Sequence, residues 1–211
     1  MIISITGKIG SGKDTVAEII QQTTQLDWEV KKFAGKLKTI AELLCGVPKQ
    51  NFESQEFKKT QMSEEWGMTY REFLQKLGTE AMRDNLHINV WINALFADYR
   101  PINDELRQSM GNVIDYSNCE WPNWIITDTR FPNEMDAVKK RKGLVIKVER
   151  SLKLRKGYDV PNETDLHPSE TALDNYNDWD YIIDNNGTLD DLRSKVIAIL
   201  EKENLIKYVS L

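Results

Sequence analysis

A glycine-rich stretch near the start of the chain constrains the fold more than any other feature. Residues 7–15 read Gly-Lys-Ile-Gly-Ser-Gly-Lys-Asp-Thr, and they follow the short apolar run Met1–Thr6. Glycine lets a backbone curl tightly, so that successive N–H groups converge as a nest for an anion. The next segment has helical spacing and would point its positive end at the same place. The order of strand, loop and helix therefore predicts a phosphate-binding loop.

The loop predicts how a nucleoside triphosphate would be held. Lys13 would reach the β- and γ-phosphates, and the loop amides would bind phosphate oxygens. The common pattern has a hydroxyl at position 14, but this chain has Asp14 there and the hydroxyl at Thr15. We expect Thr15 to serve a phosphate or the water shell of Mg²⁺, and Asp14 to face the metal or the acceptor. The expected nucleotide-binding residues are Gly7, Lys8, Gly10, Ser11, Gly12, Lys13, Asp14 and Thr15.

Segments with strand and helix character alternate along the chain. Apolar runs predict strands at 1–6, 28–33, 124–127, 144–148 and 181–183. Apolar periodicity predicts helices at 13–24, 34–45, 70–85, 89–99, 133–142, 165–176 and 188–203. This order predicts an α/β fold of the P-loop NTPase type: a three-layer sandwich with a mostly parallel five-stranded sheet and helices on both faces. We expect one domain over residues 1–211, with a helical acceptor-binding insertion at 46–123 and a short basic lid at 150–168.

Composition argues against several other classes of protein. A net charge of −5 gives no general attraction for a polyanion, so we expect no nucleic-acid partner. The sequence has no apolar run near the roughly 18 residues of a membrane-spanning helix, and its first apolar run is too short for a signal peptide. Cys45 and Cys119 match no metal spacing and predict reduced thiols in the cytoplasm. The expected partners are small molecules.

Charged residues follow two predicted strands at the sheet edge where ligands bind in parallel sheets. Asp128 could orient Mg²⁺ or its waters, and the Arg130 guanidinium suits phosphate oxygens. Alternatively, this pair is a structural cap on the strand. Arg150 and Arg155 belong to a basic segment that could close over the phosphates and neutralise charge in the transition state. That segment could also be an ordinary basic surface loop.

Residues 33–38, Phe-Ala-Gly-Lys-Leu-Lys, lie where the second predicted strand meets its helix. Lys36 and Lys38 could attract an anionic acceptor there, with help from the helix N-terminus. The alternative is that both lysines are solvated on the outer face of an amphipathic helix.

The helix predicted from residue 70 has an unusual polar face. Arg71, Gln75 and Thr79 recur at steps of four residues and share that face. Arginine suits a phosphate, and a glutamine amide can pair with a base edge. Gly78 costs the helix roughly 1 kcal/mol relative to alanine, which suggests close approach of another group. Trp91 could stack on a base or pack in the core.

Five segments together carry a resemblance to a known family. They are the loop at 7–15, residues 33–38, Arg-Glu-Phe-Leu-Gln-Lys-Leu-Gly-Thr-Glu at 71–80, Asp-Thr-Arg-Phe-Pro-Asn-Glu at 128–134 and His-Pro-Ser-Glu at 167–170. With these motifs the chain resembles the bacteriophage-type deoxynucleoside monophosphate kinases over most of its length. The resemblance implies a nucleoside monophosphate kinase fold, and ATP-dependent phosphorylation of a deoxynucleoside 5′-monophosphate with Mg²⁺. It also implies a cytoplasmic enzyme, in the host cytoplasm if a phage encodes it, and such enzymes are often homodimers.

The resemblance also implies roles for individual residues. The catalytic residues would be Lys13, Asp14, Asp128, Arg130, Arg150 and Arg155. The acceptor would be bound by Phe33, Lys36, Lys38, Arg71, Gln75, Thr79, Trp91 and Arg130. Mg²⁺ would be held by Thr15 and Asp128, in part through water. Transfer would be in line and without a covalent intermediate, since positioning and charge neutralisation suffice.

Two other functions remain open at this point. A small-metabolite kinase of the dephospho-coenzyme A or phosphomevalonate type would share the loop and the lid, but it gives no reason for the face made by Arg71, Gln75 and Thr79. A nucleotide-binding regulatory protein without turnover would leave Asp128, Arg130 and the basic lid without a common purpose.

Overall fold

The computed structural model describes residues 1–102, 119–154 and 168–206, and the chain divides into two compact units. Met1–Lys31 and Tyr99–Leu211 form the first, which we call the sheet unit. Lys32–Asp98 form the second, which we call the helical unit. The insertion predicted at 46–123 stays a prediction; the compact helical unit begins earlier in the chain and ends earlier.

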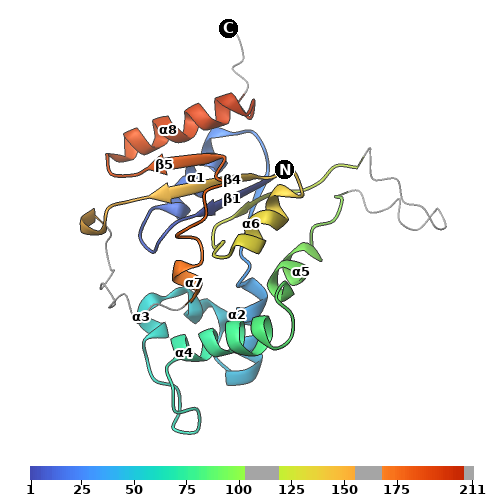
Figure 1. Cartoon of the computed structure of the whole chain (residues 1–211), viewed down its shortest axis with the longest axis vertical. Helices are drawn as coiled ribbons and strands as arrows, with labels where there is room; N and C mark the ends of the chain where they lie inside the picture. The colour runs from blue at the N-terminus through green and yellow to red at the C-terminus, as the bar shows by residue number, and fades with distance from the viewer. Residues whose placement is uncertain (103–118, 155–167, 207–211) are drawn as a thin grey trace, which may run out of the picture. The chain divides into compact units, whose positions relative to one another are not determined.

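The sheet unit contains a parallel sheet of five strands in the described residues, in the order β2-β3-β1-β4-β5 (Figure 1). The strands are β1 (Ile2–Thr6), β2 (Trp28–Lys31), β3 (Asn123–Ile126), β4 (Leu144–Glu149) and β5 (Tyr181–Asp184). Thr6 of β1 lies beside Lys147 of β4, and Ser4 lies beside Ile126 of β3. Because every pair is parallel, the loops that follow the strands meet at one edge. The predicted five-stranded parallel sheet is confirmed.

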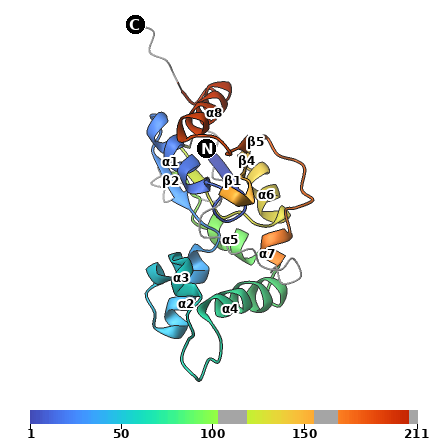
Figure 2. The ribbon, with the colours of Figure 1, turned by 90° about the vertical axis from the view of Figure 1, so that its left-hand side faces the viewer.

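Helices cover both faces of this sheet, as the alternation along β1 requires. Ile3 and Ile5 are fully buried in one core with residues of α1 (Lys13–Thr23) and α8 (Leu189–Lys202). Ser4, between them, points to the other face, where its hydroxyl meets Met135 of α6 (Pro132–Lys139). The predicted three layers are therefore present (Figures 1 and 2). Two short elements complete the described part, η4 (Leu152–Leu154) and α7 (Pro168–Thr171).

The helical unit has a small core of its own, with Ala41, Phe52, Met62 and Phe73 buried. Its elements are α2 (Gly35–Cys45), η1 (Lys49–Glu53), α3 (Gln55–Lys58), α4 (Tyr70–Gln75), η2 (Lys76–Asp84) and α5 (Val90–Phe96). The stretch 49–67 is mostly polar and exposed, and it nevertheless forms η1 and α3. The reason is Phe52, an aromatic residue with no exposed surface that packs edge-on against Phe57 and Tyr70.

The helix predicted at 70–85 exists but changes its winding. It starts with a capping box, in which Thr69 Oγ1 accepts from Glu72 N and Glu72 accepts from Thr69 N. From Lys76 it continues as the π-helix η2, whose wider turns break the spacing of four residues. The close approach at Gly78 is made by the protein itself, because a Cβ there would lie 2.7 Å from Leu37 of α2.

No helix within the three described ranges combines the length and the apolar character needed to cross a membrane.

Candidate functional site

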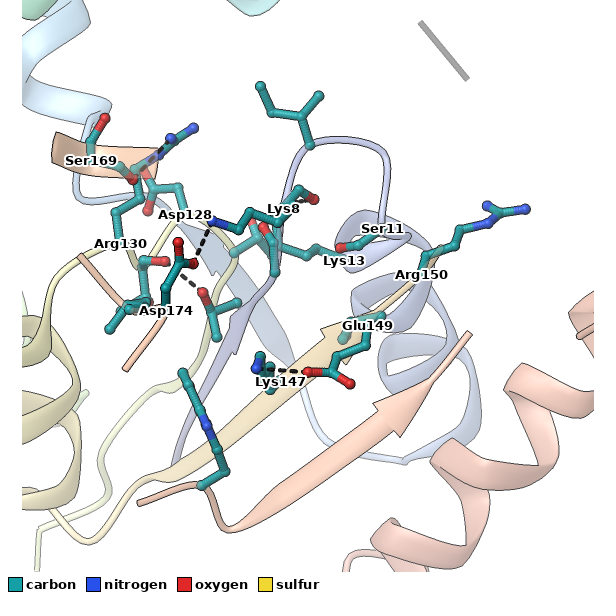
Figure 3. Close-up of a pocket in the computed structure, with 18 of the residues that line it drawn as sticks. Lys8, Ser11, Lys13, Asp128, Arg130, Lys147, Glu149, Arg150, Ser169 and Asp174 are labelled. Carbon is teal, nitrogen blue, oxygen red and sulfur yellow. Dashed lines mark hydrogen bonds and ion pairs between the residues drawn. The ribbon is translucent and has the colours of Figure 1, made fainter. Parts of the chain in front are cut away.

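A cavity of about 570 Å³ lies at the carboxyl edge of the sheet (Figure 3). It is lined by the phosphate loop and by the segments that follow β3, β4 and β5, together with residues around α7. Of the predicted site residues, those that line it are Gly7, Lys8, Ser11, Lys13, Asp128, Arg130 and Arg150. Gly10, Gly12, Asp14 and Thr15 do not line this cavity, and Asp14 is exposed.

The phosphate loop is wound so tightly that two of its glycines are required. Gly7 and Gly12 have φ angles of 151° and 99°, where side chains are strained. A Cβ on Gly7 would lie 2.3 Å from the Val148 carbonyl oxygen, and one on Gly12 would lie 2.4 Å from Asn185 Nδ2. The backbone therefore passes directly against β4 and the end of β5.

Lys13 opens α1 and turns back over the loop. Its ammonium donates to the carbonyl oxygens of Gly7 at 2.9 Å and of Lys8 at 3.1 Å. The positive charge thus spans the loop at the N-terminus of α1, which also favours an anion. This placement fits the predicted phosphate contact.

The segment after β3 is fixed by buried hydrogen bonds. Thr129 Oγ1 lies 2.6 Å from Ser4 Oγ, and Thr6 Oγ1 donates to the Thr129 carbonyl at 2.8 Å. Glu134, which is buried, accepts from the backbone N–H of Arg130 at 2.7 Å. Thr129 is therefore held from β1, and the backbone of Arg130 is held from α6, so this segment is placed before any ligand binds.

Two contacts join the cavity wall to the segment around α7. Lys8 Nζ lies 2.5 Å from Asp174 Oδ1, and Arg130 donates to the Ser169 carbonyl at 3.4 Å. In Figure 3 Lys8 and Asp174 meet across the cavity, whereas the Arg150 side chain points away from them. Both ends of the Lys8 ion pair are partly exposed, so the attraction is weak enough for a phosphate to replace it.

Two buried hydroxyls in the cavity wall suit a polar ligand. Ser11 Oγ and Thr127 Oγ1 have no hydrogen-bond partner among the described residues. Buried polar groups are normally paired, so these positions fit an oxygen-rich molecule or its water. The described ranges hold no group of three or more His, Cys, Asp or Glu side chains around a metal position. A cation here would fit the Mg²⁺ pattern, one carboxylate such as Asp128 together with phosphate oxygens.

The lysines predicted for the acceptor lie in the helical unit and have partners there. Lys36 pairs with Asp98 at 2.9 Å, and Lys38 with Glu53 at 2.6 Å. Glu53 also meets Lys32 at 3.0 Å. Burial acts to raise the pKa of the Glu53 carboxyl, but the hydrogen bonds from Lys38 and Lys32 outweigh it and hold that pKa below its usual range.

The aromatic residues predicted for the acceptor are buried. Phe33 packs edge-on against Phe96, with ring centroids 6.2 Å apart. Trp91 is 8% exposed, and its indole N–H donates to the Gly78 carbonyl at 2.8 Å. Packing thus accounts for the positions of both rings, and the stacking role of Trp91 stays a prediction.

The polar residues predicted on the helix from Tyr70 are reachable. Arg71 donates to Gln55 Oε1 at 2.9 Å, while Gln75 and Thr79 are half-buried. Their roles stay predictions. Arg155 and the motif residue His167 lie outside the described residues.

Sequence reasoning missed several residues of the cavity. Lys147 stands in β4, pairs with Glu149 at 2.7 Å and lies 5.4 Å from the Trp179 ring. The sequence offered one signal for this residue, a lysine within an otherwise apolar predicted strand. In the sheet, Lys147 lies beside Thr6. Asp174 offers no comparable signal, because only the fold brings it to the loop.

The site consists of a tightly wound phosphate loop at the N-terminus of a helix. A lysine lies over this loop, and an Asp–Thr–Arg segment lies beside it. Together these features define a phosphate-binding P-loop protein of the phosphotransferase class. The comparison with family models narrows this class. The model described as "Deoxynucleotide monophosphate kinase" matches residues 47–196, more than half of the chain, and the chain belongs to this family. It is therefore an enzyme, a kinase that phosphorylates deoxynucleoside monophosphates, and neither the small-metabolite kinase nor the regulatory protein is favoured.

Individual relatives agree with the family match. A protein of Acanthamoeba polyphaga mimivirus named for the same activity is 29% identical over 95% of this chain and 96% of its own. The deoxynucleotide monophosphate kinase of Enterobacteria phage T4 is 28% identical over 64% of this chain, which is 46% of the phage protein. Among solved structures, shikimate kinase from Acinetobacter baumannii in complex with shikimate has a TM-score of 0.50 at 15% identity, covering 97% of this chain and 94% of that one. The last match concerns the fold alone.

Proposed function

We propose that this kinase transfers the γ-phosphoryl group of ATP, with Mg²⁺, in line to a deoxynucleoside 5′-monophosphate and without a covalent intermediate. The observation that carries this proposal is the Lys13 ammonium, which lies across the phosphate loop at the N-terminus of α1. No nucleophilic side chain is required, since phosphoryl transfer depends on positioning and on neutralising charge.

The donor phosphates bind to the loop in this proposal. Lys13 exchanges its two carbonyl partners for the β- and γ-phosphate oxygens, and Lys8 leaves Asp174 for the same ligand. The backbone N–H groups of residues 7–15 complete the nest. Thr15 and Asp14, which do not line the cavity, serve the metal shell or the acceptor.

Charge that develops on the transferred group is neutralised from the cavity wall. Arg130 offers a guanidinium on a backbone already fixed by Thr129 and Glu134, and so it needs little reorganisation. Asp128 would hold Mg²⁺ together with the phosphates, and the ion supplies neutralisation of the β- and γ-oxygens when bound. Arg150, with Arg155 by sequence alone, remains the proposed cation of the lid.

The acceptor is recognised by residues of the helical unit. Arg71 suits the acceptor phosphate, and Gln75 with Thr79 suits polar groups of the nucleoside. Lys36 and Lys38 add positive charge once their ion pairs with Asp98 and Glu53 yield. Phe33 and Trp91 complete the proposed acceptor site, with the Trp91 ring stacking on the base.

A coupled assay of ADP production tests the proposal. The enzyme is given ATP and Mg²⁺ with a panel of deoxynucleoside monophosphates, ribonucleoside monophosphates and non-nucleotide acceptors such as shikimate. We expect turnover with at least one deoxynucleoside monophosphate and none with the non-nucleotide acceptors. The proposal is wrong if no monophosphate yields ADP above the background without an acceptor.

A further inference from the structure

Asn185 is a buried residue whose side chain lies against the phosphate loop. It follows β5 directly and is 6% exposed. Its backbone N–H donates to the Glu149 carbonyl at 2.7 Å, which extends the pairing of β4 and β5. Its side-chain Nδ2 donates to the Ser11 carbonyl at 2.8 Å. The residue that directly follows β5 thus holds the loop that follows β1.

The Ser11 carbonyl belongs to the same peptide group as the Gly12 N–H. In a trans peptide these two groups point in opposite directions, and the described residues contain no cis bond. Because Asn185 holds the carbonyl on one side, the Gly12 N–H must face the other side. Gly12 is the N-cap of α1. In this orientation its N–H joins the other N–H groups at the start of the helix, which have no carbonyl partner within the helix.

The hydrogen bond from Asn185 is needed because the Ser11–Gly12 peptide has a glycine on one side. Gly12 can adopt many backbone conformations, so the peptide could rotate and present its carbonyl oxygen to an anion instead. A carbonyl oxygen facing a phosphate is repulsive, whereas an N–H is a strong donor to it. The approach of Asn185 is so close that a Cβ at Gly12 would lie 2.4 Å from its Nδ2.

We propose that Asn185 is a positioning residue that locks the Ser11–Gly12 peptide with its N–H toward the phosphates of ATP. This inference rests on the proposed function for its ligand. The neighbouring Asn186 acts on the other side of the site, since its Oδ1 accepts from the N–H of Ser151 at 2.7 Å. The turn after β5 therefore orders both the phosphate loop and the start of the segment that follows β4.

Two substitutions and one control test the lock. Asn185→Ala removes the donor, and Asn185→Asp keeps the shape but turns an acceptor oxygen toward the Ser11 carbonyl. Asn123→Ala is the matched control, because that side-chain amide is also in the sheet unit and accepts from the Met1 N-terminus at 2.9 Å, away from the phosphate loop. Each protein is titrated with ATP–Mg²⁺ by calorimetry, its thermal unfolding is recorded, and the Gly12 amide is followed by ¹H–¹⁵N NMR without ligand.

The lock predicts a selective effect. The dissociation constant for ATP rises about tenfold or more in both Asn185 variants, because the hydrogen bond from the Gly12 N–H to a charged phosphate oxygen is lost. KM for ATP rises with it, KM for the deoxynucleoside monophosphate stays within twofold, and the Gly12 amide resonance moves in the ligand-free proteins. Asn123→Ala changes none of these.

Three outcomes would separate the possible errors. ATP affinity and a Gly12 resonance equal to those of the unsubstituted protein in both variants would overturn the lock. Equal increases in KM for both substrates, in step with a lower unfolding temperature, would make Asn185 merely structural. Failure of the unsubstituted protein to bind ATP, with the Gly12 resonance still displaced in the variants, would contradict the proposed function while the lock on the peptide stands.

Discussion

The two units of the molecule place charged groups in different ways. In the sheet unit, the backbone of the site is fixed by buried polar side chains, such as Thr129 on Ser4 and Asn185 on Ser11. In the helical unit, the charged residues expected at the acceptor are held by partly exposed partners, as with Lys36 and Asp98. The buried hydrogen bonds of the sheet unit are part of its fold, whereas the ion pairs of the helical unit can be exchanged for contacts with a ligand.

This difference suggests a division of labour. Rearranging buried hydrogen bonds would cost about 1–3 kcal/mol for each group left unpaired, so the donor side stays in place. Exposed ion pairs are worth at most about 1 kcal/mol, so a nucleotide phosphate can displace them at little cost. We therefore expect substitutions in the sheet unit to affect catalysis more than substitutions in the helical unit.

The largest effect is expected for Lys13→Ala. The change removes the charge that spans the loop, and kcat/KM should fall on the order of 10³-fold in the coupled assay. Lys140→Ala, also in the sheet unit but away from the cavity, should leave activity unchanged. Residual activity within tenfold of the unsubstituted enzyme would show that the loop does not hold the reacting phosphates.

Arg130→Ala should reduce kcat/KM by roughly 10²-fold, because a guanidinium placed in advance is lost from the transition state. Arg193→Ala, an exposed arginine of α8 in the same unit, is the matched control and should behave as the unsubstituted protein. Near-normal turnover of the Arg130 variant would remove that residue from the site and leave it as a cap on β3.

Arg71→Ala should change KM for one of the two substrates only. We expect KM for the deoxynucleoside monophosphate to rise about tenfold and KM for ATP to stay the same, because one charge-assisted hydrogen bond to the acceptor is lost. Gln55→Ala is informative beside it, since it removes the partner of Arg71 without removing the cation. A rise in KM for ATP alone would reverse the assignment of the helical unit to the acceptor.

Glu53→Gln should give the smallest effect, a loss of less than about 1 kcal/mol of stability near pH 7. The pKa of Glu53 is lowered in the folded protein, so its contribution is complete above the ordinary value of 4.5 and disappears as pH falls through the folded pKa. The thermal unfolding of the two proteins should therefore differ at pH 7, and the difference should shrink as the pH falls below 4.5. A difference that grows toward pH 3 would contradict this sign.

Sequence reasoning succeeded where local patterns determine structure. The glycine loop and the alternation of strands and helices are local signals, and both are present in the structure. The burial of Phe52 was not predicted, because a single aromatic residue in a polar stretch reveals little of the core that it joins. Sequence reasoning also treated the helix after Tyr70 as uniform, since nothing in the residue spacing announces the π-helix that begins at Lys76.

The site was predicted in part for the same reason. The loops after β1, β3 and β4 drew attention by their charges, whereas Asn185 and Asn186 after β5 were passed over although the same edge rule applies to them. Asp174 and Ser169 could not be predicted, because their contacts to Lys8 and Arg130 span 166 and 39 residues of sequence. Such pairings depend on the assembled fold.

The central claim is that donor and acceptor are recognised by different units of one chain. The most direct test is ¹H–¹⁵N NMR with two titrations, one of a non-hydrolysable ATP analogue with Mg²⁺ and one of a deoxynucleoside monophosphate that the assay accepts. We predict that the ATP analogue moves the amides of residues 7–15, and that the monophosphate moves those of Arg71, Gln75 and Thr79. A monophosphate that moves the loop amides and leaves residues 71–79 unchanged would contradict the account.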